Sequence, residues 1–269
     1  MEIPFWKMHG ASNDFILVDD RKRTFPARDQ EWVARIASRR TGVGCEGIIL
    51  IQPSEKADFR MRFFNPDGGE VEMCGNGARC VARLAHEIGA APLRMQFETM
   101  AGIVGAEVSE TAVRLEMTEP KDWKMNGSLD VDGKTVKYDF VNSGVAHVVV
   151  QMDDIDSVDV MKLGSAIRYH TMFAPSGTNA NFIQITGKHS LRVRTYERGV
   201  ENETLACGTG MVAAGLIAGK KKLVEKPVEV TPASGDVLEV DFELTRNGAT
   251  DVTLTGPAEH VFQGTLEYH

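Results

Sequence analysis

The sequence has few of the features that mark metal-binding, membrane or nucleic-acid-binding proteins. It contains only four cysteines in 269 residues, none in a Cys-x-x-Cys pair, so the spacing does not indicate a zinc site. No apolar run approaches the roughly 18 residues of a membrane span, and the N-terminus lacks the basic and apolar regions of a secretory signal. A formal net charge of −8 argues against nucleic acid as a partner. These absences predict a cytoplasmic protein with reduced thiols.

The sequence does have the composition of a globular protein, with 42% hydrophobic and 25% charged residues, and its length allows two domains. Hydrophobic periodicity predicts many strands and few helices. The expected strands are Phe15–Val18, Gly47–Ile51, Arg60–Phe64, Ile103–Val108, Ala112–Met117, Thr135–Phe140, His147–Met152, Asn181–Ile185, Leu191–Tyr196, Val228–Val230, Val237–Phe242 and Asp251–Leu254. The expected helices are Glu31–Arg39, Ala78–Ile88 and Met211–Gly219.

The two halves of the chain share a motif. A strand, a polar turn, the pattern Glu-x-x-x-Cys-Gly-x-Gly and a helix occur in each half, once from Glu70 to Gly77 and once from Glu203 to Gly210. The two motifs are 133 residues apart, close to half of the chain. The common order of elements indicates an internal duplication with a boundary near residue 118. We therefore predict an α+β fold with one domain at 1–118, to which a C-terminal strand at 259–269 returns, and a second at 119–258.

The repeated Cys-Gly-x-Gly pattern suggests chemistry at Cys74 and Cys207. A helix N-terminus has unpaired N–H groups and a partial positive charge, which stabilise a thiolate and lower the pKa of a cysteine placed there. Glycines beside it would let a carboxylate approach the same N–H groups. Two such helix ends could hold one carboxylate and place a thiol on each face of the neighbouring α-carbon. That arrangement suits racemisation, in which one thiolate removes a proton and the other thiol delivers one.

Other interpretations of these cysteines are simpler. A single cysteine at a helix start is more often a small buried hydrophobe than a base. The pairing of both with Gly-x-Gly in matching contexts reverses this preference. Cys45 and Cys80 lack the pattern, so we interpret Cys45 as a strand-entry residue and Cys80 as helix packing.

Longer motifs resemble those of the diaminopimelate epimerase family. The run Asn65-Pro66-Asp67-Gly68-Gly69-Glu70-Val71-Glu72-Met73-Cys74-Gly75-Asn76-Gly77-Ala78-Arg79-Cys80 resembles the first active-site signature of the family. The run Tyr196-Glu197-Arg198-Gly199-Val200, followed by Ala206-Cys207-Gly208-Thr209-Gly210, resembles the second, and Lys7-Met8-His9-Gly10-Ala11-Ser12-Asn13-Asp14-Phe15 the opening motif. The likeness extends from about residue 5 to residue 265.

The resemblance implies a fold and an activity. The fold would have two similar domains, each a curled, mostly antiparallel sheet around a central helix, with the active site in the cleft between them. The activity would be the interconversion of LL- and meso-diaminopimelate without metal or cofactor, in lysine and cell-wall precursor biosynthesis. The protein would act as a homodimer on this small-molecule substrate.

Roles follow by resemblance for the residues that match the motifs. Cys74 and Cys207 would be the acid–base pair, with His147 and Glu197 near the thiols to tune their pKa. The backbone N–H groups at the reacting carboxylate would come from Gly75, Asn76, Gly208 and Thr209. The other substrate contacts would be Asn13, Asn65, Asn179, Glu197 and Arg198. Without the family, such asparagines would be turn formers, His147 a satisfied core residue, and Glu197 and Arg198 a surface ion pair.

Two positions depart from the family pattern. Many members have Gly-Asn-Pro-His where this chain has Gly144-Val145-Ala146-His147, and often have Gln where this chain has Gly47. Both changes affect substrate binding and not the thiols. A racemase of another amino acid, such as histidine, is therefore an alternative on the same scaffold. A carboxylate-binding or thiol-redox protein is a third, which would not exchange an α-proton in deuterated water.

Overall fold

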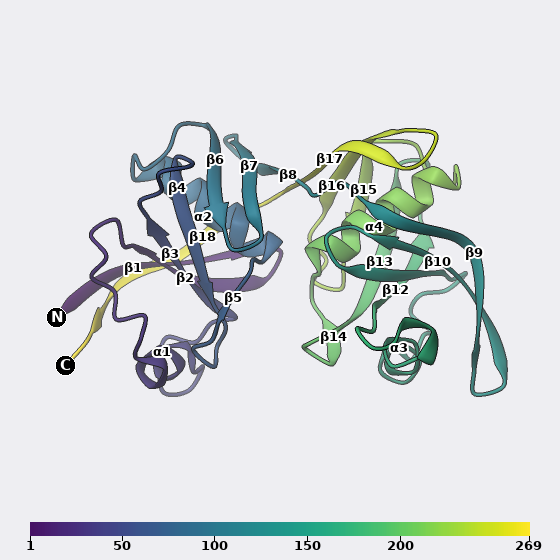
Figure 1. The fold of residues 1–269 in the computed structure, drawn as a ribbon, viewed down its shortest axis with the longest axis horizontal. Helices are drawn as coiled ribbons and strands as arrows, with labels where there is room; N and C mark the ends of the chain where they lie inside the picture. The colour runs from purple at the N-terminus through teal and green to yellow at the C-terminus, as the bar shows by residue number, and fades with distance from the viewer. The chain divides into compact units, whose positions relative to one another are not determined.

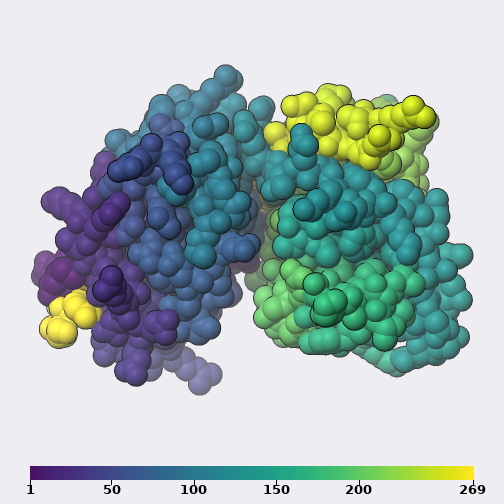
Figure 2. Space-filling view, in the orientation of Figure 1, coloured from purple at the N-terminus to yellow at the C-terminus, as the bar shows by residue number.

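The computed structural model describes all residues 1–269, and the chain divides into two units (Figure 1). Unit 1 contains residues 1–115 and 256–269, and unit 2 contains residues 116–255. The C-terminal segment belongs to unit 1 because β18 (Glu259–Glu267) pairs antiparallel with β1 (Glu2–Gly10). In the space-filling view the yellow C-terminal residues accordingly lie against the purple N-terminal segment (Figure 2).

Unit 1 is built mainly from strands. Its elements after β1 are β2 (Asn13–Asp19), α1 (Gln30–Ala37), β3 (Gly47–Gln52), β4 (Phe59–Phe64), β5 (Glu70–Val71), α2 (Gly75–Glu87), β6 (Arg94–Thr99), β7 (Gly102–Val108) and β8 (Val113–Glu116). The pairs β1–β2, β3–β4 and β6–β7 are antiparallel, whereas β2–β3 and β4–β6 are parallel. Each parallel pair is joined through a helix, as a parallel connection requires.

Unit 2 repeats this order of strands and helices. Its elements are β9 (Lys121–Val131), β10 (Lys134–Asn142), β11 (Ala146–Gln151), α3 (Val160–Arg168), η1 (Thr171–Phe173), β12 (Asn179–Ile185), β13 (Ser190–Glu197), β14 (Asn202–Thr204), α4 (Gly208–Lys220), β15 (Val228–Thr231), β16 (Leu238–Leu244) and β17 (Ala249–Gly256). When β10 is matched with β1, the parallel pairs correspond: β11–β12 matches β2–β3, and β13–β15 matches β4–β6. The α+β prediction and the internal duplication are thereby confirmed.

The two helices that begin at the cysteine motifs are largely buried. In α4, every residue from Gly210 to Gly219 is buried, which is the pattern of a helix enclosed on all sides. Small residues allow this enclosure, since a Cβ on Gly219 would lie 2.5 Å from the ring of Phe242. In α2 the buried residues run from Asn76 to Ala82 and include Leu84 and Ala85.

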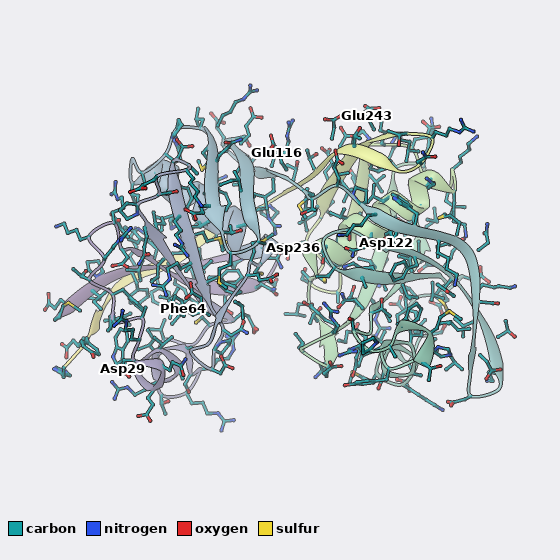
Figure 3. All side chains as sticks on the ribbon, viewed as in Figure 1. Asp29, Phe64, Glu116, Asp122, Asp236 and Glu243 are labelled. Carbon is teal, nitrogen blue, oxygen red and sulfur yellow. The ribbon has the colours of Figure 1, made fainter.

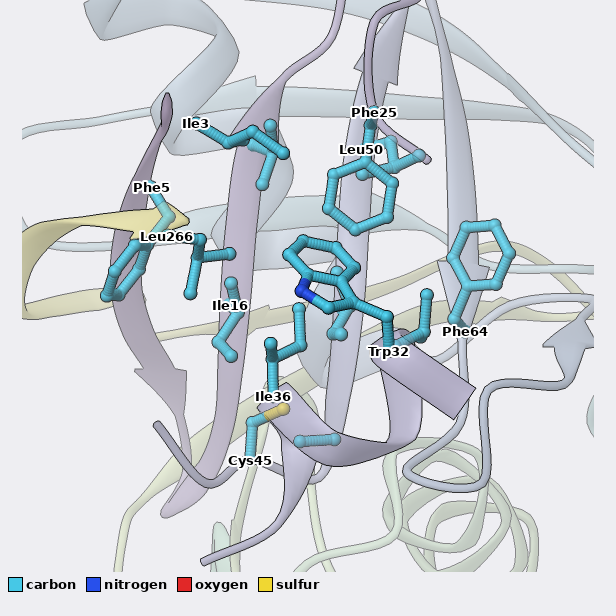
Figure 4. Packing of buried hydrophobic residues seen from close by; sticks show 14 residues of the cluster. Ile3, Phe5, Ile16, Phe25, Trp32, Ile36, Cys45, Leu50, Phe64 and Leu266 are labelled. Atoms are coloured by element: carbon cyan, nitrogen blue, oxygen red, sulfur yellow. The ribbon is translucent and has the colours of Figure 1, made fainter. Parts of the chain in front are cut away.

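A second core lies under α1 in unit 1. Asp29 caps this helix, because its carboxylate accepts the N–H of Trp32 at 3.0 Å; Figure 3 labels Asp29 at the helix start. The Trp32 ring packs 5.4 Å from Phe25 and 5.2 Å from Tyr268, and Leu50 and Ile36 complete its surroundings (Figure 4). This core fixes the outer side of the strands whose other side supports α2. Its loss in a Trp32→Ala variant would cost about 3–5 kcal/mol.

Most of the expected elements are present, but several observed elements were not expected individually, among them β5, β6, β9 and β14. The helix α3 was not expected, although Asp159 caps it by accepting the N–H of Lys162 at 3.0 Å. The strand β1 was not expected either. No helix has both the length and the apolar character needed to cross a membrane.

Candidate active site

The helix α2 begins at Cys74. The backbone of Cys74 is extended (φ −130°, ψ 125°), and its side chain makes no capping hydrogen bond to the helix. Its carbonyl oxygen accepts the N–H of Ala78 at 2.8 Å, which starts the helical ladder. The first turn contains no acidic residue. The positive end of the helix dipole therefore acts on the thiol without a carboxylate in that turn to offset it.

The helix α4 begins at Cys207 in the same way. Its backbone angles are φ −116° and ψ 109°, its side chain makes no capping hydrogen bond, and the first turn again has no acidic residue. The carbonyl of Cys207 accepts the N–H of Met211 at 2.9 Å. Cys207 is buried, with 7% of its surface exposed within the whole chain, whereas Cys74 is half-buried. Each unit thus presents one thiol at the start of its central helix.

The second glycine of each motif has a packing role that its sequence pattern did not reveal. A Cβ on Gly77 would lie 2.7 Å from Cδ1 of Ile49, and a Cβ on Gly210 would lie 2.5 Å from Oδ1 of Asn181. Both distances are too short for any other residue without movement of a neighbour. These glycines let each helix start lie directly against one strand, β3 in unit 1 and β12 in unit 2, while Gly75 and Gly208 precede them in the first turn.

A chain of polar side chains reaches Cys207 inside unit 2. His147 on β11 is fully buried, and its Nε2 lies 2.9 Å from Oγ1 of Thr209. The same hydroxyl lies 3.7 Å from Sγ of Cys207. The other ring nitrogen of His147, Nδ1, lies 3.0 Å from Nδ2 of Asn181 on β12. Burial lowers the pKa of His147 to about 3, so the imidazole is neutral at physiological pH.

Glu197 and Arg198, the expected Glu–Arg pair, lie at the end of β13. A carboxylate oxygen of Glu197 accepts the hydroxyl of Thr204 at 2.8 Å, and Arg198 donates from Nη1 to the carbonyl of Ser176 at 3.2 Å. The backbone N–H of Arg198 donates to Oδ1 of Asn179 at 2.8 Å. Asn179 also donates from Nδ2 to the carbonyl of Ala146 at 3.0 Å. The side chain of Asn179 therefore ties the Arg198 turn to the strand that carries His147.

In unit 1, Asn76 lies next to a buried arginine. Asn76 is 1% exposed, and its Oδ1 accepts Nη2 of Arg79 at 2.9 Å. The fully buried Arg79 also donates from Nε to the carbonyl of Pro257 at 3.2 Å. The hairpin between β1 and β2 packs here, since a Cβ on Gly10 would lie 2.9 Å from the carbonyl oxygen of Asn76. Asn13 pairs with Gly10 across this hairpin and so stands near the start of α2.

The turn of that hairpin is strained. Its two central residues, Ala11 and Ser12, have φ values of 55° and 64°, a region that favours glycine or asparagine. Non-glycine residues in this region cost roughly 1–3 kcal/mol when the surrounding structure enforces them. The fully buried Ala11 shows that packing enforces the turn, which in turn positions Asn13.

A charged cluster behind the hairpin was not foreseen from the sequence. The buried ammonium of Lys7 lies 2.7 Å from Asp14, and Arg39 pairs with both Asp14 and Glu46 at 2.7 Å. Burial alone would raise the pKa of Asp14, but hydrogen bonds from Arg39 and Lys7 lower it below its usual value. Lys7 also donates to the carbonyl of Gly44, which ties the loop before β3 to β1. The charged residues of the opening motif are thus scaffold contacts for Asn13.

Asn65, Gly47 and Val145 each lie at a point where the backbone is constrained by its neighbours. The N–H of Asn65 donates to the carbonyl of Gly69 at 2.8 Å, which closes the turn before Cys74. At Gly47 a Cβ would lie 2.3 Å from the ring of Phe63, so a glutamine does not fit there without movement of that ring. Val145 is half-buried, and its carbonyl accepts the N–H of Ser143 at 3.1 Å.

The remaining cysteines are structural. Cys45 is 3% exposed and Cys80 is fully buried. Burial raises the pKa of Cys45 to about 11 and that of Cys80 to about 12. No group of three or more His, Cys, Asp or Glu side chains is arranged to hold a metal ion.

Each unit by itself gathers part of the expected site. Unit 1 contributes Cys74, Gly75, Asn76, Asn13 and Asn65. Unit 2 contributes Cys207, Gly208, Thr209, His147, Asn179, Glu197 and Arg198. Sequence reasoning missed Asn181, which contacts His147 directly. Its signal was its position two residues after Asn179 on a strand, which places both side chains on one face.

The sequence closely resembles curated proteins of one family. Residues 5–123 and 140–261 match the family described as diaminopimelate epimerase. The diaminopimelate epimerase of Aquifex aeolicus (strain VF5) is 43% identical over 274 residues, which cover 97% of each chain. That of Archaeoglobus fulgidus is 41% identical over 280 residues, which cover 99% of this chain and 97% of its own.

Solved structures share the fold at lower sequence identity. A phenazine biosynthesis protein of the PhzF family from Bacillus anthracis has a TM-score of 0.75 at 17% identity and covers 100% of both chains. A probable proline racemase from Agrobacterium radiobacter K84 has a TM-score of 0.71 at 16% identity and covers 99% of this chain and 93% of its own. The fold of this chain is therefore shared by a phenazine biosynthesis protein and a probable proline racemase.

Proposed function

Because the chain belongs to the diaminopimelate epimerase family and is an isomerase of this class, we propose that Cys74 and Cys207 are its acid–base pair. The observation that carries the proposal is that each unit starts its central helix at a cysteine with no first-turn carboxylate. One thiol from each unit acts on the same α-carbon of diaminopimelate.

The proposed reaction moves one proton in and one proton out. A thiolate takes the α-proton, so a C–H bond breaks and an S–H bond forms. The thiol of the other cysteine then gives its proton to the opposite face, so that an S–H bond breaks and a C–H bond forms with inverted configuration. No oxidant, reductant or metal takes part in this balance.

The carbanion between these two steps needs strong stabilisation. We assign this role to the backbone N–H groups at Gly75, Asn76, Gly208 and Thr209, which would bind the reacting carboxylate at the positive ends of α2 and α4. Preorganised donors of this kind contribute roughly 3–4 kcal/mol each to the stabilisation of developing negative charge. Support comes from the extended backbone at Cys74 and Cys207, which starts each helix at the cysteine.

The distal end of the substrate would be bound by polar side chains around the two thiols. Arg198 can bind a carboxylate with its planar guanidinium, and Asn13, Asn65 and Glu197 supply further donors and acceptors. Asn179 acts through Arg198, whose backbone it holds. His147 and Glu197 tune the thiols from behind the substrate.

A racemase of another amino acid remains the second candidate function. Val145 and Gly47 favour it. Neither residue has a side chain that can form a hydrogen bond, whereas the family pattern has Asn at the first position and often Gln at the second. We expect LL-diaminopimelate to be turned over at least about tenfold better, in kcat/KM, than histidine or lysine. A tenfold preference needs only about 1.4 kcal/mol of differential transition-state binding. Equal or better turnover of histidine would favour the second candidate.

The setting of the enzyme also belongs to the proposal. We place it in the cytoplasm, in the synthesis of lysine and cell-wall precursor, as a homodimer. For the dimer, the supporting observation is the strand β18, where the neighbouring residues Val261 and Phe262 are 54% and 47% exposed. Adjacent exposed apolar side chains of this kind commonly mark an interaction surface.

The test of the proposed chemistry uses single cysteine variants in deuterated water. Cys74→Ala and Cys207→Ala should both abolish inversion of diaminopimelate, and Cys80→Ala should keep it. Incorporation of α-deuterium measured by mass spectrometry, together with the stereochemistry of the product, gives the readout. Inversion by either alanine variant at the parent rate would show that the two-thiol mechanism is wrong.

Oxidation offers an independent check. Two activated thiols that act on one α-carbon should form a Cys74–Cys207 disulfide in air, with loss of activity that dithiothreitol restores. Peptide mapping of the oxidised, inactive protein should find this disulfide. Cys74 bonded to Cys80, or both active thiols free, would contradict the proposal.

A further inference from the structure

The amide of Asn181 can adopt only one orientation. Its Nδ2 lies 2.8 Å from the carbonyl oxygen of Val148, which can only accept a hydrogen bond. Its Oδ1 lies 3.0 Å from the hydroxyl of Thr195, which donates to it. A flipped amide would place two acceptors against each other at Val148. Asn181 therefore presents an N–H, and not an oxygen, to His147.

This orientation fixes the tautomer of His147. Nδ1 of the ring lies 3.0 Å from Nδ2 of Asn181, and since Nδ2 only donates, Nδ1 must accept. The neutral imidazole then carries its single proton on Nε2. Nε2 lies 2.9 Å from Oγ1 of Thr209 and donates to it.

The direction of hydrogen bonding continues to the thiol. Once Oγ1 of Thr209 accepts from His147, its own proton is available for Sγ of Cys207, 3.7 Å away. A thiolate can only accept, so in that state the hydroxyl of Thr209 is the donor. When Cys207 is a thiol, its S–H can instead donate to Oγ1, because the hydroxyl has two lone pairs. The hydroxyl can thus adjust to either state while His147 stays unchanged.

The matching strand positions in unit 1 are apolar. The register that pairs His147 with Asn179 pairs Phe15 with Gly47 in unit 1, so Phe15 and Ile49 occupy the positions of His147 and Asn181. The contacts agree, since Gly77 packs on Ile49 and Phe15 where Gly210 packs on Asn181. An apolar pair in one repeat thus corresponds to a polar pair in the other.

We propose that Asn181 and His147 are positioning residues that aim a one-way hydrogen-bond chain, through the hydroxyl of Thr209, at Sγ of Cys207. The chain favours the thiolate of Cys207. The inference rests on the proposed function, in which Cys207 is an acid–base group. It adds that the strand residues against the two helix starts differ in polarity, being His147 and Asn181 in unit 2 and Phe15 and Ile49 in unit 1.

Glu197, at the end of β13, is the carboxylate that the proposed function places near the thiols, and it accepts the hydroxyl of Thr204. Apart from His147, the strands β11 and β12 carry no titratable side chain, and the first turn of α4 has no acidic residue. Arg198 is the charged group that acts on His147, and its positive charge adds to burial in lowering the pKa of the imidazole. His147 therefore remains a neutral donor over the range in which a thiol titrates.

The first experiment reads the tautomer directly. In protein labelled with ¹⁵N-histidine, two-bond ¹H–¹⁵N spectra should place the proton of His147 on Nε2, with the His147→Gln spectrum identifying the signal. In Asn181→Ala the preference should weaken, with signal from the Nδ1–H form. A proton on Nδ1 in the parent protein would overturn the proposal.

The second experiment reads the thiol. The rate of alkylation of Cys207 by iodoacetamide is followed against pH by mass spectrometry, with the Cys74 peptide as internal control. The variant Thr209→Val keeps the backbone N–H but removes the hydroxyl. In this variant the pH midpoint for alkylation of Cys207 should rise by about one unit, which corresponds to about tenfold less thiolate at neutral pH. Thr209→Ser should restore the parent midpoint, and Cys74 should keep its own in every variant.

The outcomes separate this inference from the proposed function. An unchanged Cys207 midpoint in Thr209→Val, or an equal shift at both cysteines, would overturn the chain even if Cys74→Ala and Cys207→Ala abolish inversion. Full inversion by Cys207→Ala would instead remove the catalytic role, while the alkylation data would still report on the chain. If Asn181→Ala does not fold, the variants Thr209→Val and Thr209→Ser alone test the hydrogen-bond chain.

Discussion

At the scale of single residues, the site contains a histidine that does not titrate near neutral pH. His147 is fully buried, and its two ring nitrogens are engaged by Asn181 and Thr209. Periodicity predicted that His147 begins a strand, and only the family resemblance placed it near the thiols; without the family, it was expected to be a satisfied core histidine. The structure combines the two, because a satisfied and neutral histidine is what the chain to Cys207 requires.

The buried histidine should make the protein sensitive to mild acid. The unfolded chain binds a proton at His147 below about pH 6.5, whereas the folded protein does not until about pH 3. The contribution of neutral His147 to the free energy of unfolding is therefore fully present above pH 6.5 and decreases as the pH falls toward 3. Between pH 7 and pH 5 we expect a loss of about 2 kcal/mol in the free energy of unfolding.

The matched control for this loss is His147→Gln, which offers an amide donor and acceptor but does not titrate. Urea unfolding at pH 7 and pH 5 should show a smaller difference for the variant than for the parent. An identical difference in both proteins would mean that His147 is not the group responsible.

The four cysteines should differ sharply in reactivity. Because burial raises the pKa of Cys45 to about 11 and that of Cys80 to about 12, their thiols stay protonated and shielded at pH 8. Iodoacetamide at pH 8 should therefore label Cys74 and Cys207 in the native protein and leave Cys45 and Cys80 unlabelled until the protein is unfolded. Mass spectrometry of the tryptic peptides measures this, and labelling of native Cys80 would contradict it.

At the scale of helices and strands, the start of each central helix depends on its second glycine. In Gly210→Ala the new methyl would meet Oδ1 of Asn181 at 2.5 Å, an atom held by Thr195. In Gly77→Ala it would meet the flexible end of Ile49 at 2.7 Å. Alanine gains about 1 kcal/mol of helix propensity in both cases. We therefore expect Gly77→Ala to be the milder change in stability and in activity.

Thermal unfolding and the rate of epimerisation would test this difference between the glycines. A second change, Ile49→Val, removes the methyl that clashes and should recover the loss in Gly77→Ala. No equally simple change is available for Gly210→Ala, because shortening Asn181 removes its hydrogen bonds. A milder effect at Gly210 than at Gly77 would contradict the packing argument.

Local patterns were sufficient to predict most elements. The helices α2 and α4 follow from their apolar periodicity after Cys-Gly-x-Gly, and β3 from a continuous apolar run. The helix α3 was missed because Gly164 interrupts a short pattern, yet a glycine is needed there, since a Cβ at this position would lie 2.4 Å from the side chain of Tyr196. The strand β1 was missed because it contains Pro4, and proline is uncommon inside strands. Pro4 is tolerated in the part of β1 that pairs with β18 only, since the pairing with β2 begins at Trp6.

At the scale of the whole molecule, the repeated motif was sufficient to predict the duplication but not the difference between the repeats. Both units have the same order of strands and helices, and the cysteines occupy matching positions. The contrast between Phe15–Ile49 and His147–Asn181 depends on which strand residues face the helix start. That information comes from strand register, which the sequence pattern leaves open.

A homodimer should form through the part of β18 that contains Val261 and Phe262. Val261→Glu places a charge among the exposed apolar side chains there and should shift the protein toward monomer in light scattering coupled to gel filtration. Leu244→Glu, which changes an apolar residue of unit 2 that is 46% exposed, is the matched control and should leave the mass unchanged. A dimer that survives Val261→Glu, or a parent protein that is monomeric, would contradict this prediction.

Activity should survive removal of metal ions and cofactors. The balance of the proposed reaction needs only two thiols and backbone donors, so dialysis against a chelator, without added pyridoxal phosphate, should leave the rate of epimerisation unchanged in reducing buffer. The same protein assayed before dialysis is the control. A loss of activity that a metal ion or pyridoxal phosphate reverses would require a different mechanism.

The contrast between the two repeats also has a consequence for isotopes. In the proposed mechanism the forward and reverse directions begin with different cysteines as base, one in the repeat whose matching strand residues are Phe15 and Ile49 and the other at the end of the His147 chain. The barriers for breaking the substrate C–H bond then need not be equal. With α-deuterated substrate, the kinetic isotope effect measured from LL-diaminopimelate should differ from that measured from the meso form, so an enzyme built by duplication would treat its two mirror-related half-reactions unequally.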